Sequence, residues 1–214
     1  MINIIVADDH NLFREGLTAL LHAEEGIDIV ATAANGRDTV RLAKQHLPDV
    51  VVMDVAMPGL NGIDAARQIL ELRLACRVLA LSSTNTEQAV RDMLQAGAMG
   101  YLIKECAGDE LIRAIHTVAS GQLYLSSAIT ETVVTDYLSR IDEPSTPVSR
   151  QLTSREREVL QLIAEGSSTA SVAETLSLSV KTIESHRQKI MQKLNIKSIA
   201  GLTKYAIREG LTSV

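Results

Sequence analysis

The chain contains few aromatic residues and few cysteines. Aromatic side chains make up 2% of its 214 residues, with no tryptophan among them. This scarcity argues against a pocket built to enclose a flat or acyl small molecule. The two cysteines, Cys76 and Cys106, have neither the spacing of a metal site nor a CxxC arrangement. Isolated cysteines of this kind indicate reduced thiols in a cytosolic protein.

Membrane-spanning and secretory signals are also missing from the sequence. No stretch of about 18 residues is both apolar and free of charge, so we expect no transmembrane helix and no membrane partner. The first residues, Met1-Ile2-Asn3-Ile4, already resemble a strand and lack a basic segment, which argues against a signal peptide. These features predict a cytoplasmic protein. Its length and its 46% hydrophobic content suit two domains with real cores.

Acidic charge dominates most of the chain but not its last third. Residues 151–214 hold 9 Lys and Arg and 6 Asp and Glu, a net charge of +3. Residues 1–150 hold 12 Lys and Arg and 20 Asp and Glu, a net charge of −8. An acidic part followed by a basic part is typical of a phosphorylation switch joined to a domain that binds an anion such as nucleic acid.

Five short apolar runs alternate with helical patterns over residues 2–121. Near-continuous Val and Ile runs are typical of parallel strands buried on both faces of a sheet. Their alternation with helices predicts an α/β doubly wound, five-stranded parallel sheet of the flavodoxin-like type, because right-handed crossovers place helices on both faces. The predicted strands are Ile2–Ala7, Ile27–Thr32, Val50–Met53, Val78–Leu81 and Gly100–Ile103.

Acidic residues follow two of these strands. Asp8 and Asp9 come directly after the first strand, and Asp54 comes directly after the third. Ligands of open α/β sheets bind outside the carboxyl ends of the strands, so we expect the three carboxylates to meet at one edge. They repel each other unless a cation joins them, and oxygen ligands with room for water suit Mg²⁺. Ser82 and Lys104 follow later strands and add a hydroxyl and an ammonium, which makes a phosphoryl-handling site.

This set of residues resembles the receiver domain of two-component response regulators over residues 1–121. The resemblance is carried by Asp8, Asp9, Asp54, Ser82, Tyr101 and Lys104. It implies that Asp54 accepts a phosphoryl group from a phosphohistidine on a sensor histidine kinase. The other implied roles are Mg²⁺ binding by Asp9 directly, by Asp8 mainly through water, by Asp54 and by the backbone carbonyl of Ala56, phosphoryl contacts from Ser82 and Lys104, and a switch rotamer at Tyr101.

Residues 122–150 are predicted to form a linker with an extra helix. Apolar positions at helical spacing predict that helix over residues 126–139. The segment Asp142–Ser149 carries two prolines and small polar residues, which neither continue a helix nor build a core. Residues 151–214 then form the second domain.

Residues 152–210 lack strand signals and predict four short helices. A capping box with Thr153 as cap and Glu156 three residues on opens the first helix, and Gly166 ends it. The second and third helices are joined by a tight turn, which predicts a helix-turn-helix. The last helix has a narrow apolar stripe that suits either the core or contact with a partner. The stripe consists of Leu202, Tyr205 and Ala206.

The segments Leu152–Leu160 and Lys181–Arg187 resemble the LuxR-type DNA-binding domain. With the receiver, they make the chain similar to the NarL/FixJ family of response regulators over nearly its whole length. The resemblance implies that the third helix of this domain enters the major groove, with Glu184, Ser185 and Gln188 at base-reading positions. Flanking basic side chains suit phosphates. The predicted DNA-contacting residues are Lys181, Thr182, Glu184, Ser185, Arg187, Gln188, Lys189 and Lys193.

The sequence thus indicates a transcription factor controlled by phosphorylation, and not an enzyme. Its expected partners are a sensor histidine kinase, double-stranded operator DNA, RNA polymerase and, in the active state, a second copy of the chain. Three alternatives stay open. A phosphoaspartate phosphatase would need an acid two residues after Asp54, where Ala56 stands. A ligand-sensing LuxR-type regulator is disfavoured by the missing aromatics, and a receiver without phosphorylation by the complete acidic set.

Overall fold

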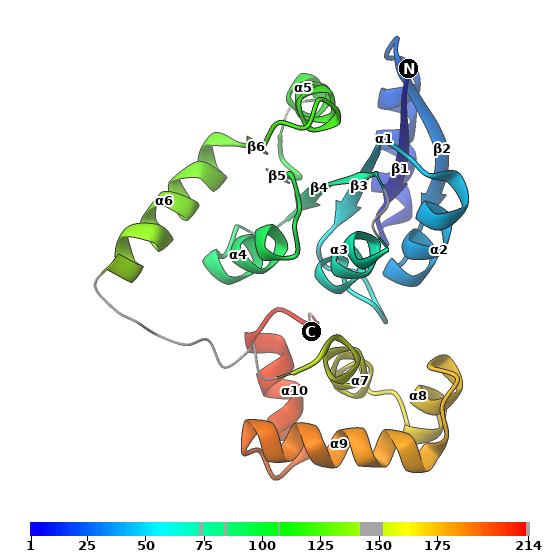
Figure 1. The fold of residues 1–214 in the computed structure, drawn as a ribbon, viewed down its shortest axis with the longest axis vertical. Helices are drawn as coiled ribbons and strands as arrows, with labels where there is room; N and C mark the ends of the chain where they lie inside the picture. The colour runs from blue at the N-terminus through cyan, green and yellow to red at the C-terminus, as the bar shows by residue number, and fades with distance from the viewer. Residues whose placement is uncertain (73–74, 84, 107, 142–151, 213–214) are drawn as a thin grey trace. The chain divides into compact units, whose positions relative to one another are not determined.

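The computed structural model describes residues 1–72, 75–83, 85–106, 108–141 and 152–212, with the backbone alone described over 136–141. The chain divides into two compact units, Met1–Glu143 and Pro144–Val214, and each is described by itself (Figure 1). Within the described ranges, no helix has the length and apolar character needed to cross a bilayer.

The first unit is built on a parallel sheet in the order β2-β1-β3-β4-β5-β6. All five predicted strands are present, with ends that differ from the prediction by at most one residue. The prediction of five strands was wrong by one, because a two-residue strand pairs with β5 at the edge. Its apolar run, Leu123-Tyr124-Leu125, is too short to identify a strand from the sequence. The strands are β1 (Ile2–Ala7), β2 (Ile27–Ala33), β3 (Val50–Asp54), β4 (Arg77–Ser82), β5 (Gly100–Ile103) and β6 (Tyr124–Leu125).

Helices cover both faces of this sheet, as the crossover rule predicts. Side chains of α1 and α5 pack on one face, where Val6, Val52 and Leu102 point. Helices α2, α3 and α4 pack on the other face, where Val51 and Tyr101 point (Figure 1). Alternate residues of each strand therefore enter different cores. The five helices are α1 (Asn11–His22), α2 (Gly36–His46), α3 (Gly62–Glu71), α4 (Glu87–Gln95) and α5 (Gly108–Ala119).

The predicted extra helix is α6 (Ser127–Ile141), and it packs against α4 and β5 of the first unit. Ile129 is fully buried in the same core as Tyr101. Tyr137 and Leu138, which the sequence also placed on the apolar side of this helix, lie outside the side chains that the structure describes. The predicted linker 142–149 lies outside the described residues, so the boundaries at 121 and 150 stay predictions.

In the second unit, all the regular elements in the described residues 152–212 are helices. Its four helices match the predicted ones, and each begins after a Ser or Thr whose side chain accepts a hydrogen bond from the first turn. The predicted capping box of Thr153 and Glu156 is confirmed. Leu202, Tyr205 and Ala206 are buried, so the apolar stripe of the last helix is core. The helices are α7 (Ser154–Ala164), α8 (Thr169–Thr175), α9 (Val180–Leu194) and α10 (Ile199–Arg208).

Candidate functional site

The ends of β1, β3 and β5 bring two carboxylates and one ammonium into direct contact. Asp8 and Asp54 are 1% and 3% exposed. The Nζ of Lys104 lies 2.7 Å from Asp8 Oδ2 and 2.7 Å from Asp54 Oδ2. The backbone N–H of Ala56 donates to the other oxygen of Asp54 at 3.2 Å. One half-buried lysine therefore bridges two buried acids from different strands.

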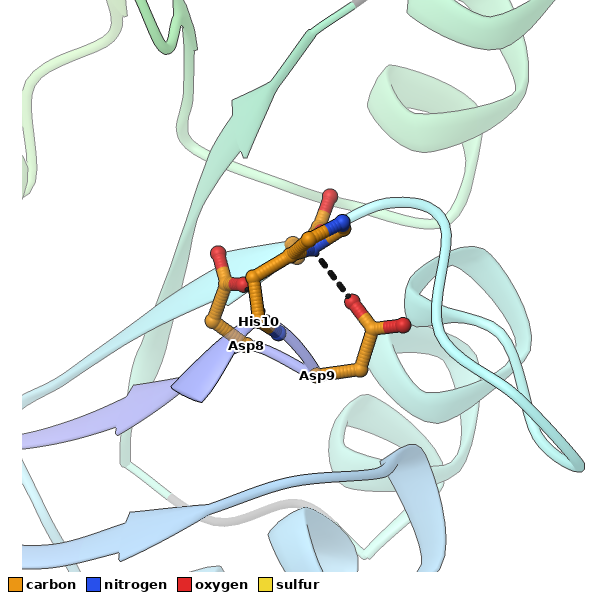
Figure 2. Close-up of side chains that lie close together, drawn as sticks. Asp8, Asp9 and His10 are labelled. Carbon is orange, nitrogen blue, oxygen red and sulfur yellow. Dashed lines mark hydrogen bonds and ion pairs between the residues drawn. The ribbon is translucent and has the colours of Figure 1, made fainter. Parts of the chain in front are cut away.

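Asp9 and His10 follow Asp8 between β1 and α1, and both are exposed. Figure 2 shows the His10 ring beside the Asp9 carboxylate. His10 Nδ1 is 2.9 Å from Asp9 Oδ1 and 3.4 Å from Asp8 Oδ1. The backbone N–H of His10 donates to Asp8 Oδ1 at 2.9 Å, and the backbone of His10 caps α1. His10 is therefore the residue at which α1 starts, and its ring also reaches the two acids.

Burial and charge act against each other at this site. Burial raises the pKa of Asp54 above the ordinary aspartate value, and the hydrogen bond from Lys104 offsets only part of that shift. Burial lowers the pKa of Lys104, but its hydrogen bonds to Asp54 and Asp8 outweigh burial and hold that pKa above the usual lysine value. The site thus keeps its cation while the charge on Asp54 is poorly stabilised.

Ser82 is the last residue of β4, the strand next to that of Asp54, and Tyr101 is the second residue of β5. Both side chains are buried, and the two hydroxyls are hydrogen-bonded to each other. Burial raises the pKa of Tyr101 to about 12, with a further contribution from the negative charge of Asp54. The buried tyrosine is therefore electrostatically coupled to Asp54 and hydrogen-bonded to Ser82.

Two residues that the sequence did not single out also support the site, both from α1. The ring of Phe13 lies under the ammonium of Lys104, with 4.7 Å between Nζ and the ring centre. The guanidinium of Arg14 donates to the backbone carbonyl of Asp8. Neither contact has a local signal, because each joins a helix to the end of a strand.

The donors of this cluster fit Mg²⁺. Ligand atoms from Asp8, Asp9, His10 and Asp54 lie within 4.8 Å of one another. Three of the four are carboxylates, the hard oxygen donors that Mg²⁺ prefers, and the exposed side of Asp9 leaves room for the waters that this ion retains. The backbone carbonyl of Ala56 stays a predicted fourth oxygen.

In the second unit, most of the predicted DNA-contacting residues lie on the exposed side of α9. The half-buried ones are Thr182, whose hydroxyl meets Ser179 at 2.8 Å, and Arg187. Lys193 is already paired, since its Nζ donates to Glu156 Oε2 at 2.7 Å. The exposed residues are Lys181, Glu184, Ser185, Gln188, Lys189 and Lys193.

Family models match both units. The response regulator receiver domain matches residues 4–116, and the model of bacterial regulatory proteins of the luxR family matches residues 150–206. The chain belongs to the NarL/FixJ family of response regulators. It is a two-component response regulator with a LuxR-type helix-turn-helix domain, and this family consists of transcription factors. Its receiver domains typically bind Mg²⁺ in an acidic pocket such as this one.

Individual relatives match nearly the whole chain. The oxygen regulatory protein NreC of Staphylococcus epidermidis is 37% identical over 98% of this chain and 99% of its own length. The response regulator UvrY of Escherichia coli is 36% identical, with 99% and 96% covered. Among solved structures, the receiver domain of NarL from Mycobacterium tuberculosis is 36% identical, with a TM-score of 0.56 over 56% of this chain and 98% of that one. The RcsB–DNA complex matches 95% of this chain and 96% of that one, with 25% identity and a TM-score of 0.60.

Proposed function

We propose that a sensor histidine kinase phosphorylates Asp54 and that the phosphoryl group controls dimerisation and operator binding. The observation that carries this proposal is the Lys104 ammonium, held at 2.7 Å from both Asp54 and Asp8. A cation at this place balances the acids before phosphorylation and is already within reach of oxygens that a phosphoryl group would add.

The phosphoryl transfer would use the residues of the described site together with Mg²⁺ and the phosphohistidine of the kinase. An oxygen of Asp54 attacks the phosphorus of a phosphohistidine in line, and its new bond to phosphorus forms as the nitrogen–phosphorus bond breaks. Asp54 needs no base, because it reacts as the carboxylate. Mg²⁺ held by Asp8, Asp9 and Asp54 would neutralise charge on the transferring group. Lys104 and Ser82 supply further donors to the phosphoryl oxygens.

The switch that follows involves Ser82 and Tyr101. Phosphorylation adds a charge of about −1.5 to −2 at Asp54 if other phospho-residues are a guide. Lys104 and Ser82 then turn toward the phosphoryl oxygens, and the hydrogen bond between Ser82 and Tyr101 is lost. Because Tyr101 packs in one core with Ile129 of α6, a change of its rotamer reaches the sheet edge and α6.

The DNA-binding part of the proposal places α9 in the major groove of a double-stranded operator. Glu184, Ser185 and Gln188 read bases, because all three are exposed and carry donors or acceptors that suit base edges. Lys181 and Lys189 are exposed cations that suit phosphates, with Thr182 and Arg187 beside them. Lys193 would have to share its ammonium with Glu156. RNA polymerase is a further proposed partner once the operator is bound.

A second copy of the chain would meet the outer side of α10. The inner stripe of this helix is core, but Ile199 and Ile207 are 52% and 37% exposed and lie eight residues apart, two turns along the same side. Thr203 lies between them and is half-buried. Ile207→Asp is expected to prevent dimerisation of the phosphorylated chain in sedimentation experiments. Leu47→Asp, at an exposed leucine of the first unit, is the control and should leave dimerisation unchanged.

The central experiment is labelling by a small-molecule phosphodonor. Asp54→Ala should abolish acid-labile labelling, and chelation of Mg²⁺ by EDTA should do the same. Asp28→Ala removes an exposed aspartate of β2 and serves as the matched control, with normal labelling expected. Normal labelling of the Asp54→Ala chain would refute the proposed phosphorylation site.

A further inference from the structure

The same four-residue pattern caps two neighbouring helices. Asn35-Gly36-Arg37-Asp38 opens α2, and Asn61-Gly62-Ile63-Asp64 opens α3. In each, the Asn side chain accepts a hydrogen bond from the Asp backbone N–H, at 2.9 Å in α2 and 2.8 Å in α3. Each Asn amide also donates to the Asp carboxylate, at 2.9 Å and 3.3 Å. Helices α2 and α3 pack against each other, so the two caps are parts of one packed region of the first unit.

The glycine of each cap lies against the loop that carries the phospho-acceptor site. A Cβ added to Gly62 would overlap the carbonyl oxygen of Asp54 and lie 3.0 Å from its carbonyl carbon. A Cβ added to Gly36 would overlap the carbonyl oxygen of Leu60 and lie 3.0 Å from its carbonyl carbon. Neither glycine has a positive φ. Both positions therefore need glycine for space and not for backbone conformation.

Gly62 and Gly36 contact the two ends of the short loop between β3 and α3. Gly62 touches the loop where it leaves β3, and its N–H donates to the carbonyl of Val55 at 2.9 Å. Gly36 touches the loop near its end, at Leu60, whose side chain is fully buried. Between them lies Ala56, whose N–H donates to Asp54 and whose carbonyl is the proposed fourth oxygen for Mg²⁺.

We infer that Gly36 and Gly62 are positioning residues that fix the phospho-acceptor loop at the depth that Mg²⁺ binding requires. A methyl group at either place pushes a backbone carbonyl, which no rotamer change can relieve. The displacement moves Asp54 or the end of the loop and with it the Ala56 carbonyl. Gly36 of α2 thus acts on a site to which α2 contributes no ligand. This inference rests on the proposed function of the site.

The test is a Mg²⁺ titration of the full-length chain without phosphodonor. Calorimetry measures the Mg²⁺ affinity, and NMR monitors the amide resonance of Ala56. Gly62→Ala is expected to weaken Mg²⁺ binding by about tenfold or more, the range seen when groups that support metal ligands are altered. Gly36→Ala is expected to weaken it less. In both variants the Ala56 amide resonance should shift even without the metal, because the loop itself has moved.

Two controls separate positioning from loss of stability. Gly16→Ala makes the same change within α1, where the added Cβ meets nothing within 4 Å, and should leave Mg²⁺ affinity unchanged. Asn35→Ala removes the α2 cap, at a cost of about 1 kcal/mol in stability, without pressing on Leu60. It should also bind Mg²⁺ normally at a temperature where circular dichroism shows a folded chain.

Each result decides the inference. Mg²⁺ affinity equal to that of the unaltered chain in Gly62→Ala and Gly36→Ala would overturn it, as would an equal loss in Asn35→Ala. Should Gly62→Ala not fold, Gly36→Ala decides alone. An unfolded Gly36→Ala chain counts against the inference, because the contact would then serve the fold and not the site. If the unaltered chain neither binds Mg²⁺ nor labels, the proposed function has failed instead.

Discussion

Each unit of the chain holds a lysine against a buried carboxylate, and the two pairs differ in what surrounds them. In the first unit Lys104 Nζ lies 2.7 Å from Asp54, and in the second Lys193 Nζ lies 2.7 Å from Glu156. The two carboxylate side chains are 3% and 5% exposed. Distance and burial alone therefore do not distinguish the pairs.

The difference lies in how many donors stabilise each carboxylate. Burial raises the pKa of Glu156, but hydrogen bonds from Lys193 and from the backbone and side chain of Thr153 outweigh burial, so the pKa is lowered. For Asp54 burial prevails, because its lysine is shared with Asp8, a second acid whose charge raises the pKa further. Glu156 has enough donors to stabilise its charge, and its hydrogen bonds stabilise the start of α7. Asp54 has too few donors, which suits a carboxylate proposed to bind a metal cation and to accept a phosphoryl group.

The largest expected effect comes from removing the lysine of the first pair. Lys104→Ala should still accept label from a phosphodonor, because Asp54 remains, but labelling should no longer tighten operator binding. The reason is that no cation then moves from the acids to the phosphoryl oxygens. The measurement is operator affinity of labelled and unlabelled chains. A phosphorylation-dependent gain as large as that of the unaltered chain would show that the shared lysine has no part in switching.

Removing the charge of the second pair should lower the stability of the second unit. The folded-state pKa of Glu156 is lowered, so its contribution is present above the unfolded-state pKa and is lost as the pH falls through the folded-state pKa. Glu156→Gln is therefore expected to cost about 1–2 kcal/mol at neutral pH, the range for a lost cap. It should also flatten the acid limb of the stability curve, which denaturant unfolding across pH measures. An unchanged acid limb would contradict the assignment.

The matching change in the first pair should act in the opposite direction. The folded-state pKa of Asp54 is raised, so stability is highest below the unfolded-state pKa and is lost as the pH rises through the folded-state pKa. Asp54→Asn removes that loss and should stabilise the first unit at neutral pH in the absence of Mg²⁺. The same denaturant experiments measure it. If both amide substitutions destabilise their units, the distinction between the two pairs does not hold.

The smallest effect separates the two lysines of α9. Lys189 is exposed, and Lys189→Ala should reduce the salt slope of DNA binding by about 1 for all sequences, as loss of one phosphate contact does. Lys193 is held by Glu156, so Lys193→Ala should reduce the slope less and lower stability more. The measurements are affinity across a salt series and denaturant unfolding. Equal slopes for both variants would mean that Lys193 leaves Glu156 when DNA binds.

Local patterns carried much of the prediction. Apolar runs placed the long strands, and their last residues placed Asp8 and Asp54 at one edge, because all parallel strands end on the same side. The capping box of Thr153 and Glu156 is a four-residue signal and fixed the start of α7. These features depend on neighbours in the sequence, so the sequence by itself determined them.

Features that join distant segments had no such signal. The strand β6 is two residues long, and its pairing with β5 depends on where α5 and α6 pack. Lys193 lies 37 residues from Glu156, and nothing near either residue marks the pair. The stripe of α10 could equally have been core or interface until the other helices covered it, with Leu202 fully buried.

The sequence thus determined the fold class, the edge where the acids gather and the helix that is proposed to face DNA. Each of these follows from a period, a cap or a strand end that a few consecutive residues encode. Only the tertiary structure decided which acid each lysine contacts. It also decided which positions must be glycine because the carbonyl of Asp54 or of Leu60 leaves no room for a Cβ. Such choices depend on distances across the core, which are set when all the elements pack together.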